Sequence, residues 1–359
     1  MAAMDAKLNF DFRTNQRLIQ KIGLLDGFNN RWEATVQKEG SYARALYKTA
    51  FTRRLAASLR LSGIEVSDDM VERRLKNPEP ETLENQAIAG YREVLLLILE
   101  DHHEVPLTEK TLFELHKLLW KFSPEAEPTK GKYKTEPNEA AIFLPDGTRR
   151  VLFATDSPAQ TGKALKKALK WYNEALDQKT LHPLLAIGAW VYEFACIHPF
   201  ASGNGRLLRL LLNLMLLRNG YHFVAYAPLE SILEKRGHDL ARTLSEAHRQ
   251  RGTKKETIGE WMLYLLECLE SLAEQLETRY KPYQTAGHYL TDRQKQIKAY
   301  LQQNQPLKIS DLEKGLPNIS VHNMKKDLQQ LVILNEVEKI GNYKSTIYIV
   351  KTQSANTPH

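Results

Sequence analysis

Cysteine is scarce in this sequence, and long uncharged apolar runs are absent. The two cysteines among the 359 residues, Cys196 and Cys268, both lie in apolar surroundings typical of reduced, buried thiols. Two cysteines are too few for a disulfide scaffold or a cysteine-rich zinc site. The most apolar stretch, residues 207–217, contains Arg209 and Asn213 and is too short to cross a bilayer. We therefore expect no membrane-spanning helix.

The sequence also lacks internal repeats, low-complexity segments and an N-terminal secretory signal, in which a charged segment precedes an apolar one. We therefore expect a cytoplasmic protein with conventional folded domains. Hydrophobic residues make up 42% of the chain, which is enough for a sizeable core, and the length suffices for two or three domains. The net charge of +7 permits anionic partners such as nucleotides or nucleic acid without requiring them.

Most of the chain shows apolar residues at the spacing of amphipathic helices, so the predicted fold class is mainly α. Thr108 has the position of an N-cap before one such helix, and Asn219-Gly220 is a typical helix end. The other predicted helices cover residues 40–62, 83–100, 158–177, 184–196, 206–218, 229–250 and 257–280.

One strand-like segment interrupts the helical pattern. Two apolar runs flank Asp146-Gly147, and an Asp-Gly pair between such runs is a strong hairpin signal. Because an isolated hairpin is only marginally stable, other elements must support it. We predict that it forms a flap over a site. Its candidate docking residues are Ile142, Phe143, Leu144, Val151 and Leu152.

The helical pattern breaks near residues 281–287, where we place a domain boundary. Downstream, three short helical segments precede two strand-like runs, residues 336–340 and 346–350, with a turn at Gly341-Asn342. This order is typical of a winged helix-turn-helix domain, which we predict for residues 285–359. Its third helix would contact DNA, although many winged helices bind proteins instead. The candidate DNA contacts are His322, Asn323, Lys325 and Lys326.

A glycine-rich loop, residues 198–206, joins two apolar helices and has the parts of an anion-binding site. Gly203 and Gly205 allow left-handed backbone, which lets neighbouring N–H groups converge. The positive end of the following helix dipole faces the loop. Arg206 and Arg209 are one turn apart on one helix face, an arrangement that suits a polyphosphate.

His198 begins this loop. Histidine is the side chain whose ordinary pKa best suits proton transfer near neutral pH, so beside bound phosphate it would accept the proton of an attacking hydroxyl. A lone histidine or a lone Gly-x-Gly is more often structural. The combination with two arginines and two flanking helices favours a functional site.

The pattern His-Pro-Phe-x-x-Gly-Asn-Gly-Arg-x-x-Arg from His198 to Arg209 resembles the signature of the Fic family, whose best-known members transfer AMP from ATP to protein hydroxyls. The resemblance extends over about residues 40–280, and residues 130–134 are similar to the segment that the family places before its flap. It implies a helical bundle in which the flap aligns a target segment by strand addition.

The resemblance implies roles for the loop residues. His198 would be the general base, Asn204 and the loop amides would bind the α-phosphate, and both arginines would hold the outgoing phosphates. The implied catalytic residues are His198, Asn204 and Arg206. The implied nucleotide-binding residues are Ser202, Gly203, Asn204, Gly205, Arg206 and Arg209. The expected domains are a helical region at 1–110, a Fic core at 111–280 and the winged helix at 285–359.

Two positions depart from the family pattern. Ser202 stands where the family usually has the Asp or Glu that holds Mg²⁺, and a hydroxyl is a poorer ligand for that ion. No metal ligand is therefore certain, although Mg²⁺ is expected with ATP. Downstream, Arg236 and Leu240-Ala241 stand where the family has an Asn and paired tyrosines near the base and ribose. A solvated helix charge is the alternative interpretation of Arg236.

Many Fic proteins carry an inhibitory helix with the pattern Ser/Thr-x-x-x-Glu-Gly/Asn. Here Ser62 and Glu65 resemble part of it, whereas Leu61 and Val66 depart from it. We predict that Glu65 pairs with Arg209 and competes with a phosphate. The alternative is that Glu65 is a surface charge at a helix end.

The sequence therefore predicts an AMP-transferase that uses ATP to modify a Tyr, Thr or Ser hydroxyl of a protein target or of itself. Two alternatives stay open. One is a DNA-binding regulator whose degenerate site binds a nucleotide without turnover. The other is a Fic enzyme that uses another phosphate-containing donor or removes AMP. A homodimer is also left open.

Overall fold

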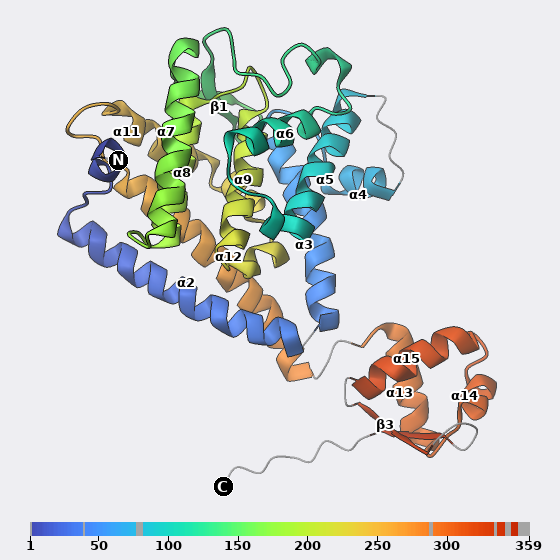
Figure 1. Cartoon of the computed structure of the whole chain (residues 1–359). Helices are drawn as coiled ribbons and strands as arrows, with labels where there is room; N and C mark the ends of the chain where they lie inside the picture. Colours follow the sequence, from blue (N-terminus) through green and yellow to red (C-terminus); the bar gives the residue numbers. More distant parts are fainter. Residues whose placement is uncertain are drawn as a thin grey trace. The chain divides into compact units, whose positions relative to one another are not determined.

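The computed structural model describes residues 2–38, 40–76, 82–286, 290–333, 336–341 and 346–350. The chain divides into two compact units, Met1–Thr278 and Arg279–His359 (Figure 1). The mainly α class is confirmed, since helices dominate both units and the strands form two short hairpins. Within the described ranges, no helix is both long enough and apolar enough to cross a membrane.

The larger unit is a helical bundle with one hairpin. Its helices are α1 (Ala2–Ala6), α2 (Phe12–Lys38), α3 (Gly40–Arg60), α4 (Asp68–Lys76), α5 (Leu83–Asp101), α6 (Glu109–Leu119), α7 (Pro158–Asp177), α8 (Pro183–Ile197), α9 (Asn204–Arg218), α10 (Leu229–Lys235), α11 (Gly237–Arg249) and α12 (Gly259–Ala286). Three short 3₁₀ helices, η1 (His102–Glu104), η2 (Pro124–Ala126) and η3 (His222–Tyr226), and the strands β1 (Glu139–Phe143) and β2 (Arg149–Ala154) complete it.

Helices α8 and α9 form the centre of this bundle. Nearly every residue of both helices is buried, as expected for α8, which is apolar on almost all sides, whereas α9 also buries Arg206, Arg209 and Asn213. They pack against each other, α7 covers α8, and α5 packs against α9 (Figure 1). The loop between α8 and α9 is therefore held between two buried helices at the centre of the bundle.

Helix α2 lies along α12, although the sequence analysis did not predict it. Ion pairs join the two helices over their length: Arg17 to Glu267 at 3.4 Å, Lys21 to Glu270 at 2.6 Å and Arg31 to Glu277 at 3.1 Å (Figure 1). These contacts, between residues some 250 positions apart, join the N-terminal part of the larger unit to its last helix.

Most predicted helix boundaries agree with the structure. Thr108 caps α6 by accepting a hydrogen bond from the Thr111 backbone, as predicted. The single helix predicted for residues 229–250 is wrong, because the chain breaks at Arg236 into α10 and α11. Helix α12 also runs on to Ala286, past the point where the sequence pattern breaks.

The predicted hairpin is present. Strands β1 and β2 pair antiparallel with a bulge between Ala140 and Ala141, and Gly147 takes the positive φ of 81° that its turn requires. The backbone N–H of Phe143 donates to Leu61, just after α3, at 3.2 Å. The Phe153 ring stacks on His248 of α11 at 4.0 Å. The support that a lone hairpin needs therefore comes from both sides.

The smaller unit contains α13 (Asp292–Asn304), α14 (Ile309–Gly315), α15 (Val321–Ile333), β3 (Val337–Ile340) and β4 (Ile347–Val350), in the predicted order. Its core includes Ile297, Leu301, Leu312, Leu328 and Leu331. Strands β3 and β4 pair antiparallel, and Asn342 of the predicted turn lies outside the described residues. The winged-helix arrangement itself stays a prediction.

Candidate active site

The loop 198–206 makes a sharp turn between α8 and α9. His198 ends α8 in the left-handed conformation, with φ of 49° and ψ of 64°, and its N–H donates to Phe194 at 2.8 Å. Gly203 has φ of 75° immediately before α9. A Cβ there would lie 2.8 Å from Trp120 Nε1, so only glycine fits. No side chain caps α9, which leaves its first backbone N–H groups without partners inside the helix.

Asn204 holds the loop closed. Its Oδ1 accepts from the Phe200 N–H at 2.9 Å, and its Nδ2 donates to the Phe200 carbonyl at 2.7 Å. Asn204 is also 1% exposed. The family resemblance implied that this side chain binds phosphate, whereas here both ends of its amide are engaged within the loop. The backbone N–H groups of the first turn of α9, which no side chain caps, are the donors that a phosphate could use.

His116, which the sequence analysis did not single out, supports the loop from α6. Its Nδ1 accepts from the Gly131 N–H at 2.8 Å, and its Nε2 lies 3.0 Å from the Ser202 carbonyl and 3.1 Å from Trp120 Nε1. Its ring stacks on Phe200 at 3.9 Å. Burial lowers the pKa of His116 to about 4, so the ring stays neutral.

Lys134, within the segment that resembles the family's pre-flap region, braces the same loop. Its Nζ donates to the Ile197 carbonyl at 3.0 Å, to Thr155 Oγ1 at 2.7 Å and to Asn138 Oδ1 at 2.9 Å. Its backbone N–H donates to Pro199 at 2.9 Å. Burial lowers the pKa of this ammonium to about 8.

The His198 imidazole is free to accept a proton. Its Nδ1 is buried and has no hydrogen-bond partner among the residues that the structure describes. Burial, followed by the nearby charge of Lys134, lowers the pKa of His198 to about 3. The ring is therefore neutral near pH 7, the state that a general base requires.

Arg206 is a buried cation that faces an aromatic ring. It is 5% exposed, and its Nη1 has no hydrogen-bond partner in the described part of the chain. Its guanidinium lies 4.4 Å from the centre of the Trp120 ring. Burial and the neighbouring charge of Arg209 lower the pKa of Arg206 to about 10. A buried, unpaired guanidinium is costly unless an anion joins it.

Arg209 is also buried, and it contacts the end of α3. Its Nε donates to Ser58 Oγ at 2.8 Å, and its Nη2 donates to the Ser58 carbonyl and to Ser62 Oγ, each at 2.6 Å. Burial lowers the pKa of Arg209. Across the described ranges, neither Arg206 nor Arg209 forms an ion pair with a carboxylate. Both guanidiniums therefore lie near the start of α9 without a directly bonded carboxylate, and the negative charges that act on Arg209 include those of Glu230 and Glu234.

The predicted contact between Glu65 and Arg209 is wrong. Glu65 is exposed, and Ser62 occupies the position beside the guanidinium. The reason is that Gly63 turns the chain with φ of 78° directly after α3, which carries Glu65 away from α9. Of the two predicted inhibitory residues, only Ser62 reaches the site.

An apolar cavity of about 80 Å³ lies beneath the hairpin. His198, Asn204, Gly205 and Arg209 line its polar end. Its apolar wall comes from the hairpin and from helices α8 to α12, and includes Ala140, Ala141, Ile142, Leu152, Leu208, Leu233, Leu240, Leu244 and Trp261. The cavity thus connects the loop to the underside of the predicted flap.

The predicted docking residues differ in their surroundings. Ile142 and Leu152 line the cavity, and Leu144 is buried. Phe143 packs against Gly63, where a Cβ would approach its ring to 2.5 Å. Val151 is 44% exposed, so it is the one of the five that is open to a partner.

The loop does not fit a Mg²⁺ site made by protein ligands. Ser202 is exposed, its carbonyl is taken by His116, and residues 198–206 contain no carboxylate. Mg²⁺ prefers carboxylate and phosphate oxygens. Any Mg²⁺ here would have to arrive on the phosphates of the nucleotide.

Arg236 lies between α10 and α11 and contacts α12. Its guanidinium pairs with Glu267 at 3.1 Å and Asp239 at 3.5 Å, and lies 4.9 Å from the centre of the Tyr264 ring. These contacts make Arg236 a partly buried link between the α10–α11 junction and α12, so neither the base-pocket role nor a freely solvated helix charge is shown. Leu240 lines the cavity instead.

The candidate DNA contacts belong to the smaller unit. His322, Lys325 and Lys326 are exposed on α15, and Asn323 is partly buried near its start. The Asn323 N–H donates to Ser320 Oγ at 3.4 Å, which is how Ser320 caps the helix. Their function in DNA contact stays a prediction.

Comparison with known proteins connects the larger unit to one family. Residues 106–216 match the Fic/DOC family. Protein adenylyltransferase fic-1 from Caenorhabditis elegans is 28% identical over 126 residues, which are 35% of this chain and 22% of that protein. Protein adenylyltransferase Fic from Nematostella vectensis is 26% identical over 157 residues, 42% of this chain and 33% of that protein. The chain thus aligns with a third or less of these relatives.

Two solved structures share the fold at low sequence identity. A Fic family protein from Desulfovibrio desulfuricans G20 is similar with a TM-score of 0.61 at 19% identity, over 95% of this chain and 97% of that one. Fic-1 from C. elegans is similar with a TM-score of 0.57 at 17% identity, over 76% of this chain and 73% of that one.

Proposed function

This chain contains a Fic domain at residues 106–216, and we propose that it is a protein AMP-transferase, which moves AMP from ATP to a Tyr, Thr or Ser hydroxyl of a protein target or of itself. One observation carries the proposal. Two buried guanidiniums without carboxylate partners face the uncapped start of α9, next to a neutral histidine that lacks a hydrogen-bond partner among the described residues. The adenylyltransferase names of the relatives support the choice of reaction.

In this proposal the triphosphate lies across the start of α9. The backbone N–H groups of the first turn and the helix dipole stabilise charge on the α-phosphate, and Arg206 and Arg209 neutralise the outer phosphates. Gly205 makes room for this, because a Cβ there would lie 3.4 Å from Arg209 Nη1. The apolar cavity of about 80 Å³ beneath the flap borders the same residues.

The transfer step needs one base. His198 takes the proton of the attacking hydroxyl, whose oxygen forms a bond to the α-phosphorus while the bond from that phosphorus to the bridging oxygen breaks. Pyrophosphate leaves with the electron pair of the broken bond. An incoming polyanion raises the pKa of His198 from its value of about 3, which makes the imidazole a stronger base when the substrate is present.

The first prediction tests the reaction itself. Purified full-length protein incubated with ATP and Mg²⁺ should gain the mass of one or more AMP groups, and His198→Ala should abolish the gain, because His198 is the base in this proposal and its Nδ1 lacks a hydrogen-bond partner among the described residues. Intact-mass spectrometry measures both. His238→Ala, an exposed histidine on α11, is the matched control and should keep the gain.

Pyrophosphate release, measured on the same samples, distinguishes AMP transfer from ATP binding without turnover. A wild-type protein that binds ATP tightly and yields neither adduct nor pyrophosphate contradicts the proposal. That result would favour a regulator that binds a nucleotide without turnover, a second candidate that rests on the absence of a carboxylate from residues 198–206.

A further inference from the structure

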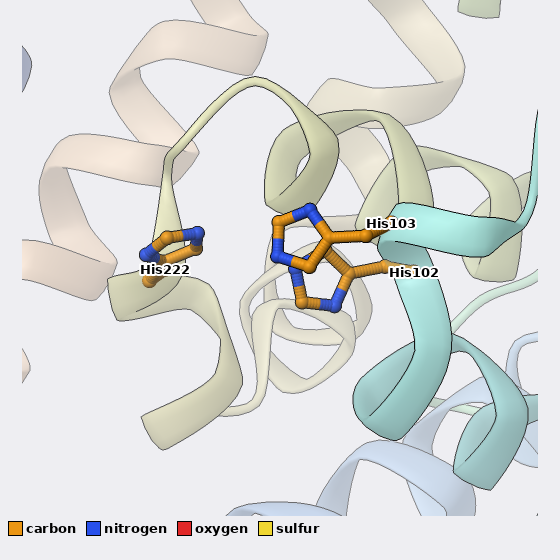
Figure 2. Close-up of side chains that lie close together, drawn as sticks. All are labelled: His102, His103 and His222. Atoms are coloured by element: carbon orange, nitrogen blue, oxygen red, sulfur yellow. The ribbon is translucent and has the colours of Figure 1, made fainter.

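Three histidines meet at the end of α9 that lies opposite the loop 198–206 (Figure 2). His102 and His103 form the start of η1, directly after α5, and His222 is the first residue of η3. One ring nitrogen from each histidine lies within 4.8 Å of those of the other two. The centre of the His102 ring lies 4.0 Å from that of His103 and 5.9 Å from that of His222.

The backbone that presents His102 and His103 is held in place. Nη1 of Arg218, the last residue of α9, donates to the carbonyls of His102, His103 and Val105 at 3.1, 2.9 and 3.0 Å. One guanidinium therefore ties three backbone carbonyls, in and just after η1, to the end of α9. The two imidazoles project from this fixed backbone toward His222 (Figure 2).

The ring nitrogens of His102 make no hydrogen bond to the described part of the protein. Both are buried, and neither has a hydrogen-bond partner among the described residues. The Ile98 carbonyl, one turn earlier, interacts with this ring only outside ordinary hydrogen-bond geometry. Buried polar atoms are usually paired, so two unpaired nitrogens on one ring point to an absent partner.

The third histidine, His222, has a carboxylate partner. Glu33 Oε1 of α2 lies 3.3 Å from His222 Nδ1. A carboxylate on one ring nitrogen orients the imidazole and makes its other nitrogen a better metal ligand. It leaves Nε2 of His222 for a ligand and adds the negative charge that a cation needs beside three neutral rings.

The three histidines also border a cavity of about 430 Å³, whose other walls include Glu33, Tyr47 and Tyr226. This space admits a metal ion together with its water ligands. Three protein ligands plus water is a common coordination set for zinc.

We propose that His102, His103 and His222 bind one divalent transition-metal ion of the zinc class, with Glu33 orienting His222. Imidazole nitrogens bind zinc at about 2.0–2.1 Å, which places them roughly 3.4 Å apart in a tetrahedron. Small side-chain rotations close the separation of up to 4.8 Å. The ion joins η1 to η3, and Glu33 of α2 is linked to it through His222. At the end of α9, the ion lies about 22 Å from the start of that 15-residue helix. It is therefore independent of any Mg²⁺ that arrives with ATP.

The second prediction is that metal-free full-length protein binds about one Zn²⁺ per chain and gains thermal stability, since the ion joins two separate segments, η1 and η3. Titration calorimetry against a competing chelator measures the affinity. Co²⁺ bound in place of Zn²⁺ should give the visible absorption that is typical of a tetrahedral site. His103→Ala and His222→Ala should weaken binding by about 100-fold or more, and Glu33→Gln by about 10–100-fold.

His103 is exposed, so its replacement does not threaten folding, and His238→Ala of α11 removes a matched exposed histidine. The control should bind Zn²⁺ as the wild type does. Absence of Zn²⁺ binding by the wild type, or equal binding by His103→Ala and His222→Ala, overturns the proposal. None of these measurements depends on AMP transfer, so they test the metal site independently of the proposed function.

Discussion

Arg209 is buried, yet its partners in the described part of the chain are Ser58 and Ser62 and no carboxylate. An arginine held by neutral hydroxyls keeps its full charge available to an incoming phosphate. The sequence pattern suggested that Glu65 would occupy this arginine, and the turn at Gly63 prevents it. In the described part of the chain no carboxylate bonds directly to Arg209, although the charges of Glu230 and Glu234 act on it.

The third prediction follows from this contact. Ser62→Glu places a carboxylate within reach of Arg209, and a charged hydrogen bond in a buried site should reduce ATP affinity and self-modification by roughly tenfold or more. Nucleotide titration and intact-mass spectrometry measure the two effects.

Glu65→Gln is the control for Ser62→Glu, because Glu65 is exposed and should leave both quantities unchanged. Unaltered ATP binding by Ser62→Glu would mean that Arg209 does not hold the nucleotide. A strong gain of self-modification in Glu65→Gln would instead indicate that Glu65 inhibits the site.

Among the secondary-structure elements, the hairpin shows most clearly how a local pattern depends on distant support. Asp146-Gly147 predicts the turn, but the hairpin is held by the Leu61 carbonyl after α3 and by His248 of α11. Phe143 packs on Gly63, so the flap contacts the turn that follows α3. A change at Gly63 should therefore act on target alignment more than on nucleotide binding.

The fourth prediction tests this coupling. Gly63→Ala brings a Cβ to 2.5 Å from the Phe143 ring and strains a residue with φ of 78°, so the β1 end of the flap must shift. The rate of self-modification should fall by roughly tenfold, since a small misplacement of the reacting groups is costly, while ATP affinity changes little.

Gly252→Ala provides the comparison for Gly63→Ala, because Gly252 has a similar φ of 76° and nothing within 4 Å of the added Cβ. Equal effects of the two substitutions on the rate would show that backbone strain alone, and not the contact with the flap, is responsible.

The larger unit as a whole keeps several histidines neutral. Burial holds the pKa of His116 at about 4 and that of His198 at about 3, both below the ordinary value near 6.5. Below pH 6.5 the unfolded chain binds protons at these two positions and the folded chain does not. The free energy of unfolding therefore falls as the pH is lowered from about 6.5 toward 4.

The fifth prediction is that chemical denaturation at pH 7, 6, 5 and 4 shows this loss, up to about 1.4 kcal/mol per pH unit for each histidine. His116→Gln and His198→Ala should each reduce the slope, whatever their effect on stability at pH 7. A slope that is the same in both variants as in the wild type would mean that other groups cause the acid sensitivity.

The sequence alone determined the mainly α class, the hairpin, the helix cap at Thr108 and the loop from His198 to Arg209. Each depends on interactions between residues close together in the chain, which periodicity and turn chemistry report directly. Helix α2 was missed, although Leu18, Leu25 and Trp32 repeat at a seven-residue spacing on its buried side, because polar residues and two glycines dilute that pattern.

The tertiary structure decided the partners of the functional side chains. Whether Ser62 or Glu65 meets Arg209, and whether His116 supports Ser202, depends on contacts between residues far apart in the chain. The same holds for the meeting of His102 and His103 with His222. Such contacts arise when separate helices pack and bring distant side chains together, and no local spacing encodes them.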